Sequence, residues 1–226
     1  MAAPRRRPSN LLALAVLGVL AQRPMHPYEI ATTLRDYGKD SSIKVKWGSL
    51  YTVVATLEKN GLICATGTDR QGGRPERTIY GLTDEGREEL GDWLRELLSV
   101  PDREYPRFEA ALSLIAVVPP QEAAALLESR LRRLDGEIVA QRAALEHYAK
   151  TLPRLFLIES EFHVALLEAE AGWVRDIVEQ LSTGTFPDQA SWLRFHQTGE
   201  VPTDFADWTG PDRPGEEAAG TAPQAP

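Results

Sequence analysis

The chain has 226 residues, which is long enough for one large or two small domains. No apolar run approaches the roughly 20 residues that a membrane-spanning helix needs. The net charge of −8 is divided unevenly, because residues 1–80 carry 12 Lys or Arg and 6 Asp or Glu, whereas residues 81–226 carry 13 and 27. This division excludes a uniformly acidic protein and places positive potential in the first part of the chain, where a nucleic acid could bind.

Two short helices are predicted at the start of the chain. The apolar run Asn10–Ala21 follows three arginines and could belong to a signal peptide, but it is short and leads into prolines, with no clear small-residue cleavage site. We therefore interpret it as a core helix capped by Ser9, and we expect a cytoplasmic protein. A second helix, from Tyr28 to about Asp36, would turn three apolar residues inward: Ile30, Ala31 and Leu34.

A third helix is predicted to end at Asn60-Gly61 and has two distinct faces. Leu50, Val54 and Leu57 form its inward stripe. The opposite stripe, at i, i+3, i+7 and i+10, carries short hydroxyls and one cation: Ser49, Thr52, Thr56 and Lys59. Such side chains suit a helix in the major groove, where short donors and acceptors reach base edges. The alternative is an ordinary solvated helix face.

A basic hairpin follows this helix and favours DNA contact over the solvated face. Strands are predicted at Leu62–Thr66 and Thr78–Leu82, with a glycine-rich tip between them. Cys64, the single cysteine, excludes an internal disulfide and is interpreted as an inert core residue of the first strand, with a redox sensor as the minor alternative. The residues predicted to contact DNA are Ser49, Tyr51, Thr52, Thr56, Lys59, Arg70, Arg74 and Arg77.

The chain beyond Pro101 is predicted to be helical. A helix over Phe108–Val118 would end at two prolines. A heptad seam of about four repeats then runs to Leu152 and contains Ala124, Leu127, Leu131, Leu134, Ile138, Gln141, Leu145 and Tyr148. After Pro153, a second long helix carries one apolar stripe: Ile158, Phe162, Leu166, Ala169, Trp173, Ile177 and Leu181. Two such helices predict an antiparallel hairpin or a partner-binding arm.

Catalytic and metal sites are not predicted. The four histidines are scattered without metal-ligand spacing, and no phosphate-binding glycine loop precedes a helix, so we expect neither an enzyme nor a cofactor. Aromatic residues do gather in the helical part. They are interpreted either as ordinary core or as the walls of a pocket for a planar effector, formed by Trp93, Tyr148, Phe162 and Trp173.

Five segments of the first 98 residues together resemble the PadR family of transcriptional regulators. They are His26–Ile30, Gly48–Tyr51, Leu57–Ile63, Gly73–Pro75 and Tyr80–Gly86. The resemblance implies a dimeric winged-helix repressor that a small molecule releases from DNA in many members. The family usually has glycine at the position of Pro27 and often has basic residues at the positions of Ala55, Thr56 and Glu76. These departures imply fewer phosphate contacts and a shallower salt dependence.

The sequence as a whole predicts a mainly α protein. A winged helix-turn-helix DNA-binding domain would occupy residues 9–98, an all-helical dimerisation and effector domain residues 103–182, and a partly disordered tail residues 183–226. The predicted function is a ligand-responsive repressor that binds a pseudo-palindromic operator as a homodimer. The alternative is a winged-helix module that binds protein and not DNA.

Overall fold

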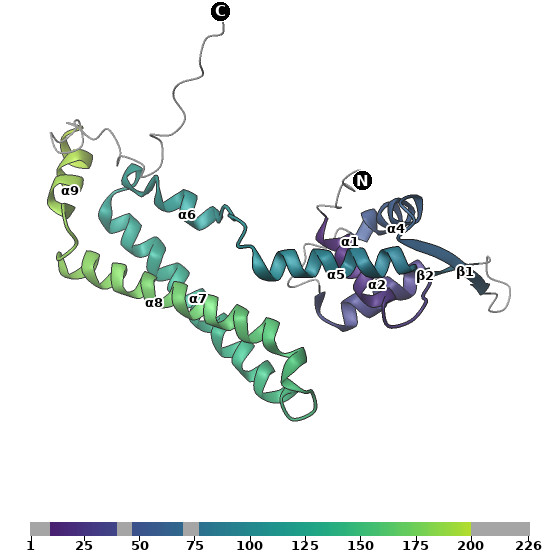
Figure 1. The fold of residues 1–226 in the computed structure, drawn as a ribbon. Coiled ribbons are helices and arrows are strands. Elements are labelled where there is room, and N and C mark those ends of the chain that lie inside the picture. Colours follow the sequence, from purple (N-terminus) through teal and green to yellow (C-terminus); the bar gives the residue numbers. More distant parts are fainter. Residues whose placement is uncertain (1–9, 40–46, 70–76, 200–226) are drawn as a thin grey trace, which may run out of the picture. The chain divides into compact units, whose positions relative to one another are not determined.

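The computed structural model describes residues 10–39, 47–69 and 77–199, and the chain divides into two compact units, Met1–Glu104 and Tyr105–Pro226 (Figure 1). Both units are helical in the residues described, and a two-stranded sheet lies in the first. The predicted fold class, mainly α with a winged helix-turn-helix, is therefore confirmed. No helix among the described residues is both long and apolar enough to cross a lipid bilayer.

The first unit is a winged helix built on one apolar core. Its elements are α1 (Leu11–Leu20), α2 (Pro27–Asp36), the 3-10 turn η1 (Trp47–Ser49), α4 (Leu50–Lys59), β1 (Ile63–Asp69), β2 (Arg77–Leu82) and α5 (Asp84–Ser99). Asn10 caps α1 by accepting a hydrogen bond from the Leu12 N–H, so the prediction that Ser9 does this is wrong. The inward residues predicted for α2 and α4 are buried or half-buried in this core, as Trp93 of α5 also is.

The α4–β1 turn and the start of α5 are joined by specific backbone contacts. α4 ends in a Schellman motif, in which the Leu62 N–H donates to the Leu57 carbonyl and Gly61 has a φ of 72°. The Thr83 hydroxyl donates to the Gly61 carbonyl at 2.7 Å and accepts from the Gly86 N–H at 3.0 Å. A Cβ on Gly86 would overlap the Leu62 carbonyl oxygen, so the close approach of α5 to this turn requires glycine.

Cys64 is exposed, which corrects the prediction that it is a core residue. Successive side chains of a strand point to opposite faces, and Ile63 takes the core-facing position in β1. Cys64 therefore points away from the core. Only one face of this two-stranded sheet packs on the core. The sequence of β1 does not indicate whether Ile63 or Cys64 lies on that face.

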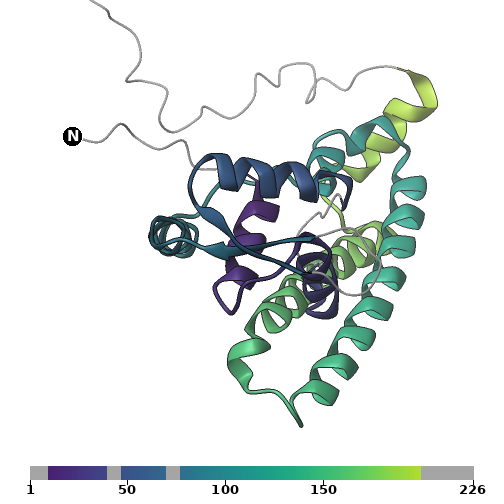
Figure 2. The ribbon, with the colours of Figure 1, turned by 90° about the vertical axis from the view of Figure 1, so that its right-hand side faces the viewer.

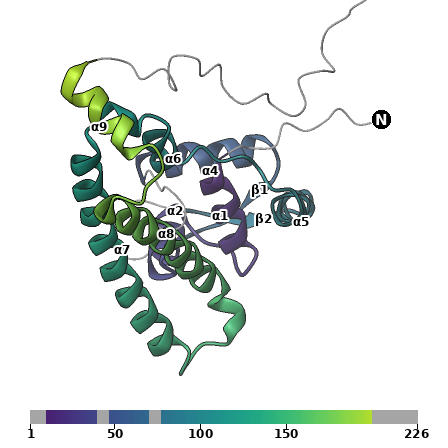
Figure 3. The same cartoon turned by 90° about the vertical axis from the view of Figure 1, so that its left-hand side faces the viewer.

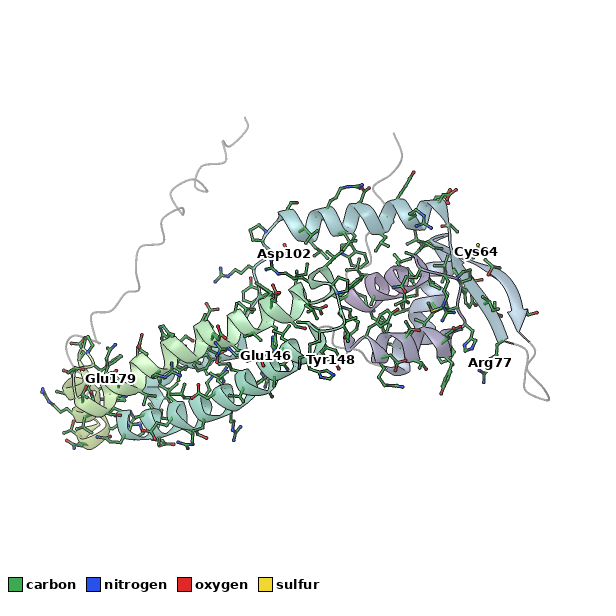
Figure 4. The ribbon with its side chains drawn as sticks, turned by 90° about the horizontal axis from the view of Figure 1, so that it is seen from below. Cys64, Arg77, Asp102, Glu146, Tyr148 and Glu179 are labelled. Carbon is green, nitrogen blue, oxygen red and sulfur yellow. The ribbon has the colours of Figure 1, made fainter. Side chains whose placement is uncertain are left out.

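The second unit is a long helical hairpin with short helices at one end. Its elements are α6 (Arg107–Leu112), η2 (Ile115–Val117), α7 (Pro120–Tyr148), η3 (Arg154–Phe156), α8 (Ile158–Thr183) and α9 (Gln189–Thr198). The helix predicted over Phe108–Val118 is thus two shorter pieces. Helices α7 and α8 run side by side (Figure 2), with Tyr148 near one end of the hairpin and Glu179 near the other (Figure 4).

Ion pairs flank the seam between α7 and α8 in two rows. Arg130–Glu170 and the His163–Glu137 contact form one row, and Asp135–Arg175 and Arg142–Glu168 form the other. Along each row the residue numbers rise on α7 and fall on α8, so the two helices are antiparallel. Within each row the pairs recur after seven residues, which is the repeat of a coiled coil. The predicted heptad seam of α7 is therefore used within one chain, where it buries Leu127, Leu134 and Ile138.

The stripe predicted for α8 does not face α7 over most of its length. Ala171 and Val174 are buried in the cluster shared with α7, whereas Phe162 is 65% exposed and Trp173 46%. Phe162 and Ala171 are nine residues apart, or about two and a half turns, so they point in opposite directions. Helix α8 is thus apolar on two faces, and the predicted stripe is mostly the outer one.

The tail predicted as partly disordered contains an ordered helix, α9, which lies beside the start of α7 (Figure 3). The Trp192 indole N–H donates to the Val118 carbonyl, and the His196 ring bonds the Ala116 carbonyl, each at 2.9 Å. These bonds give hydrogen-bond donors to two backbone carbonyls in and beside η2, where no regular α-helix supplies them. The rest of this predicted tail, residues 200–226, lies outside the described residues.

Candidate nucleic-acid interface

Helix α4 presents the polar face that the sequence predicts. Tyr51, Thr52, Thr56 and Lys59 are exposed, while Val53 and Val54 are buried on the other side. Ser49 is half-buried in η1, one residue before α4 begins. The exposed residues of α4 also include Ala55 and Glu58, but the two threonines, the tyrosine and the lysine are those that can contact base edges and phosphates.

The Thr56 side chain offers an acceptor and a methyl group to a ligand. Its hydroxyl donates to the Thr52 carbonyl one turn earlier, at 2.7 Å. This internal bond uses the hydroxyl proton and fixes the rotamer. The oxygen lone pairs can still accept a hydrogen bond, and the methyl group can contact the thymine methyl in a major groove.

The wing is an antiparallel pair of strands, and one of them, β2, is also held to the α1–α2 turn. Strands β1 and β2 pair from Ile63–Leu82 to Asp69–Arg77, with a bulge between Ala65 and Gly67. On its other side, β2 pairs with the α1–α2 turn, where Met25 and Tyr80 exchange two backbone hydrogen bonds of 3.0 and 2.9 Å. Arg77, the first residue of β2, is half-buried, whereas Arg70 and Arg74 lie outside the described residues.

Strand β2 and helix α4 approach each other at Tyr80, which the sequence did not indicate. Tyr80 packs against the apolar core of the first unit, to which the buried residues of α4 also belong. Partial burial is the main cause that raises the pKa of the Tyr80 phenol above its ordinary value, and the Glu58 carboxylate near the end of α4 raises it further. The wing and α4 are thus packed on one core.

A second contact missed from sequence lies at the outer end of the wing. The Arg77 guanidinium lies over the ring of Tyr28, 5.7 Å from its centroid, and Tyr28 is the second residue of α2. Figure 4 labels Arg77 beside this helix. Tyr28 belongs to a segment that carried only a family resemblance in the sequence. The 49 residues that separate it from Arg77 leave no sequence pattern for the contact.

The four residues predicted to line an effector pocket are distributed over both units. Trp93 lies in the core of the first, and Tyr148, Phe162 and Trp173 lie in the second with side chains about half exposed or more. Phe162 and Trp173 are eleven residues apart on α8, which separates them by about 16 Å along the helix. A single small ligand could therefore not contact both rings.

Trp173 has an aromatic neighbour that the sequence did not indicate, and this neighbour is in turn covered by an arginine. Its ring packs edge-on against Phe108 of α6, with centroids 6.2 Å apart. The Arg130 guanidinium lies 3.7 Å from the centroid of Phe108 and bonds Glu170. Trp173, Phe108 and Arg130 thus form a compact group at the junction of α6, α7 and α8.

Comparison with known proteins finds similarity to transcriptional regulators. Residues 16–92 match the family described as "Transcriptional regulator PadR-like family". The chain is 28% identical over 130 residues to the negative transcriptional regulator PadR of Bacillus subtilis, covering 57% of this chain and 70% of that protein. Both matches are to transcriptional regulators, which agrees with the prediction of a protein that is not an enzyme.

Solved structures agree with the fold. The Bacillus subtilis PadR in complex with operator DNA superposes with a TM-score of 0.65 at 21% identity, covering 76% of this chain and 99% of that one. The same regulator in complex with p-coumaric acid gives a TM-score of 0.64 at 20% identity over the same shares. At this identity the likeness establishes the fold of the chain.

Proposed function

We propose, from the premise that this chain is a PadR-like transcriptional regulator, that it binds a pseudo-palindromic operator as a homodimer and represses transcription nearby. The observation that carries the proposal is the exposed polar face of α4, packed on the same core as a wing that bears Arg77. Helix α4 enters the major groove, and the wing contacts the adjacent backbone or minor groove. Because a regulator of this kind acts on DNA, we propose that the protein is cytoplasmic.

Residues of α4 and the wing take different roles in this proposal. Tyr51, Thr52 and Thr56 contact base edges, and Ser49 and Lys59 contact phosphates at the two ends of the helix. Arg70, Arg74 and Arg77 carry the cationic side of the wing. The domain limits proposed from the sequence, 9–98 and 103–182, keep these contacts within the first domain.

The outer face of α8 is the proposed contact with a second copy of the chain. Ile158, Phe162, Leu166 and Trp173 are each exposed by 46% or more within one chain. A continuous apolar stripe of this length is unusual on a lone helix of a soluble protein and marks an interaction site. Self-association gives a two-fold dimer, which matches the symmetry of a pseudo-palindromic operator.

A small aromatic effector is proposed to act near Trp173. Bacillus subtilis PadR, whose fold this chain shares, has been solved in complex with p-coumaric acid. Here Trp173 and Phe108 supply aromatic surfaces, and Trp173 lies on the face proposed to meet the second copy. A planar ligand stacking there changes the spacing of the two recognition helices and so releases DNA. Fluorescence quenching that is lost in Trp173→Phe would support this, and an unchanged response would move the site elsewhere.

Salt-dependent binding to duplex DNA tests the proposed function. Fluorescence anisotropy would be measured with duplexes that tile the region upstream of the protein's own gene. We expect Lys59→Ala to weaken binding by about 1 kcal/mol and to reduce the salt slope by about 1. Lys150→Ala, which removes an exposed cation of the second unit, is the control and keeps wild-type affinity. Wild-type protein that binds no duplex at low salt would favour the protein-binding alternative.

The direction of regulation needs a separate experiment. A reporter gene placed behind the protected DNA would be compared in cells with and without the protein. Repression predicts higher expression without it. Lower expression in its absence would make the chain an activator, with the same DNA contacts.

A further inference from the structure

The segment His26–Glu29 has no part in the DNA contacts predicted above, yet its side chains are arranged around the wing. Tyr28 is 64% exposed, which is unusual for a ring that makes specific contacts. The Arg77 guanidinium nevertheless lies 5.7 Å from its centroid, within the roughly 6 Å at which a cation is attracted to an aromatic face. Arg77 is half-buried, although it stands at the free end of the wing.

The ring of Tyr28 is itself held by its neighbours. The His26 ring packs against it at 29° with centroids 6.2 Å apart. His26 is fixed in turn, because its Nδ1 accepts the Glu29 N–H at 3.1 Å as the N-cap of α2. Glu29 forms an ion pair with Arg23 across the same turn. The backbone pairing of Met25 with Tyr80 then places this whole turn beside β2.

We propose that Tyr28 is a positioning residue for the wing, which holds the Arg77 guanidinium against its ring and so presents it to the DNA backbone in one orientation. This rests on the proposed function. A free arginine side chain at a strand end would sample many rotamers and lose their entropy on binding. The aromatic face removes part of that loss before DNA arrives, while the guanidinium edge keeps its N–H donors for phosphate oxygens.

A double-mutant cycle measured by DNA binding separates positioning from direct contact. We expect Tyr28→Leu to weaken binding by about 2- to 5-fold, the range expected for an exposed cation–aromatic contact. Tyr28→Phe keeps the ring and should keep wild-type affinity. In an Arg77→Ala background, Tyr28→Leu should have no further effect, because the side chain that it positions is gone. Tyr37→Leu, an exposed tyrosine at the other end of α2, is the matched control and should bind normally.

A second readout needs no DNA. In the free protein, the side-chain protons of Arg77 should have NMR shifts displaced by the Tyr28 ring current. The displacement should disappear in Tyr28→Leu and persist in Tyr28→Phe. Thermal melting of all variants confirms that the fold is retained.

The outcomes that overturn the proposal are distinct from failure of the function. Wild-type affinity of Tyr28→Leu, or an equal loss in both Arg77 backgrounds, overturns the positioning role while DNA binding stands. Absence of the ring-current shift in the wild-type protein overturns it as well. A wild-type protein that binds no duplex at any salt concentration overturns both the proposed function and the role of Tyr28 within it.

Discussion

The two units bury their apolar residues to different degrees. In Met1–Glu104 the core side chains of α1, α2 and α4 are almost completely buried, and the exposed leucines gather mainly at the end of α5, where Leu98 is the most exposed. In Tyr105–Pro226 the seam of α7 is buried, but α8 keeps a second apolar face in solvent. The winged helix thus buries its core side chains within one chain, whereas the hairpin keeps an exposed apolar surface that could bind a second molecule.

The largest expected effect tests the self-sufficiency of the first unit. Gly86→Ala places a Cβ against the Leu62 carbonyl oxygen, which neither backbone can avoid without moving α5. We expect a loss of about 3 kcal/mol in the free energy of unfolding, at the upper end for overpacking. Calorimetry of the purified variant would measure it.

Gly91 provides the control on the same helix. A Cβ there meets only the end of the flexible Arg95 side chain, at 3.4 Å. Gly91→Ala should therefore stabilise the unit by about 0.5–1 kcal/mol, because alanine loses less backbone entropy in a helix. An unchanged melting temperature for Gly86→Ala would mean that α5 packs less closely on the turn than the structure indicates.

The next largest effect concerns the outer face of the second unit. Phe162→Glu should weaken self-association by about 2 kcal/mol, because burying a phenylalanine contributes roughly that amount. Sedimentation over a concentration series would measure the shift. Val139→Glu is the control, since Val139 is equally exposed but lies on α7. A wild-type dimer constant for Phe162→Glu would place the interface elsewhere. Leu134→Glu is less informative, because Leu134 is buried inside the hairpin and its loss would unfold the unit.

Sequence periodicity predicted the first unit better than the second, and the reason is physical. Helix α4 has one apolar stripe, Leu50, Val54 and Leu57, so its inward face is unambiguous. Helix α8 has two, and periodicity cannot tell which faces α7 and which remains outside. Helix α9 is as long as α1, α2 and α4, but it was missed because it is held in place by the bond from Trp192 to Val118, 74 residues earlier.

The candidate site divides in the same way. The outward residues of α4 follow from spacing on one helix, and the described ones occupy the predicted positions, although whether they contact DNA stays a prediction. The pairs found beside the wing, Tyr28–Arg77 and Glu58–Tyr80, consist of residues that are far apart in sequence. Only the fold brings such pairs together, so no spacing rule could have indicated them.

A smaller effect tests the connection between wing and helix inside the first unit. Tyr80→Phe removes a partly buried hydroxyl close to the Glu58 carboxylate and should lower the free energy of unfolding by about 1 kcal/mol near pH 8. Because the folded state raises the pKa of Tyr80, this contribution is complete below the ordinary tyrosine pKa of about 10 and is lost as the pH rises through the raised value. Urea unfolding of both proteins at pH 8 and at pH 11 would measure the difference. A difference that grows with pH would contradict the assignment.

The smallest effect concerns the ion pairs that flank the hairpin. Arg142 bonds Glu168 at 2.6 Å, but its side chain is 61% exposed, so solvent screens the pair. Arg142→Gln should lower the free energy of unfolding by no more than about 0.5 kcal/mol, and the difference should vanish in 1 M salt. Arg130→Gln offers the contrast on the same seam, since Arg130 is less exposed and also stacks on Phe108. If Arg142→Gln instead lowered the free energy of unfolding by about 2 kcal/mol, the amount that Phe162→Glu is expected to remove from self-association, the hairpin would be stabilised chiefly by its ion pairs. The apolar outer face of α8 would then contribute less to the second unit than its exposed area implies.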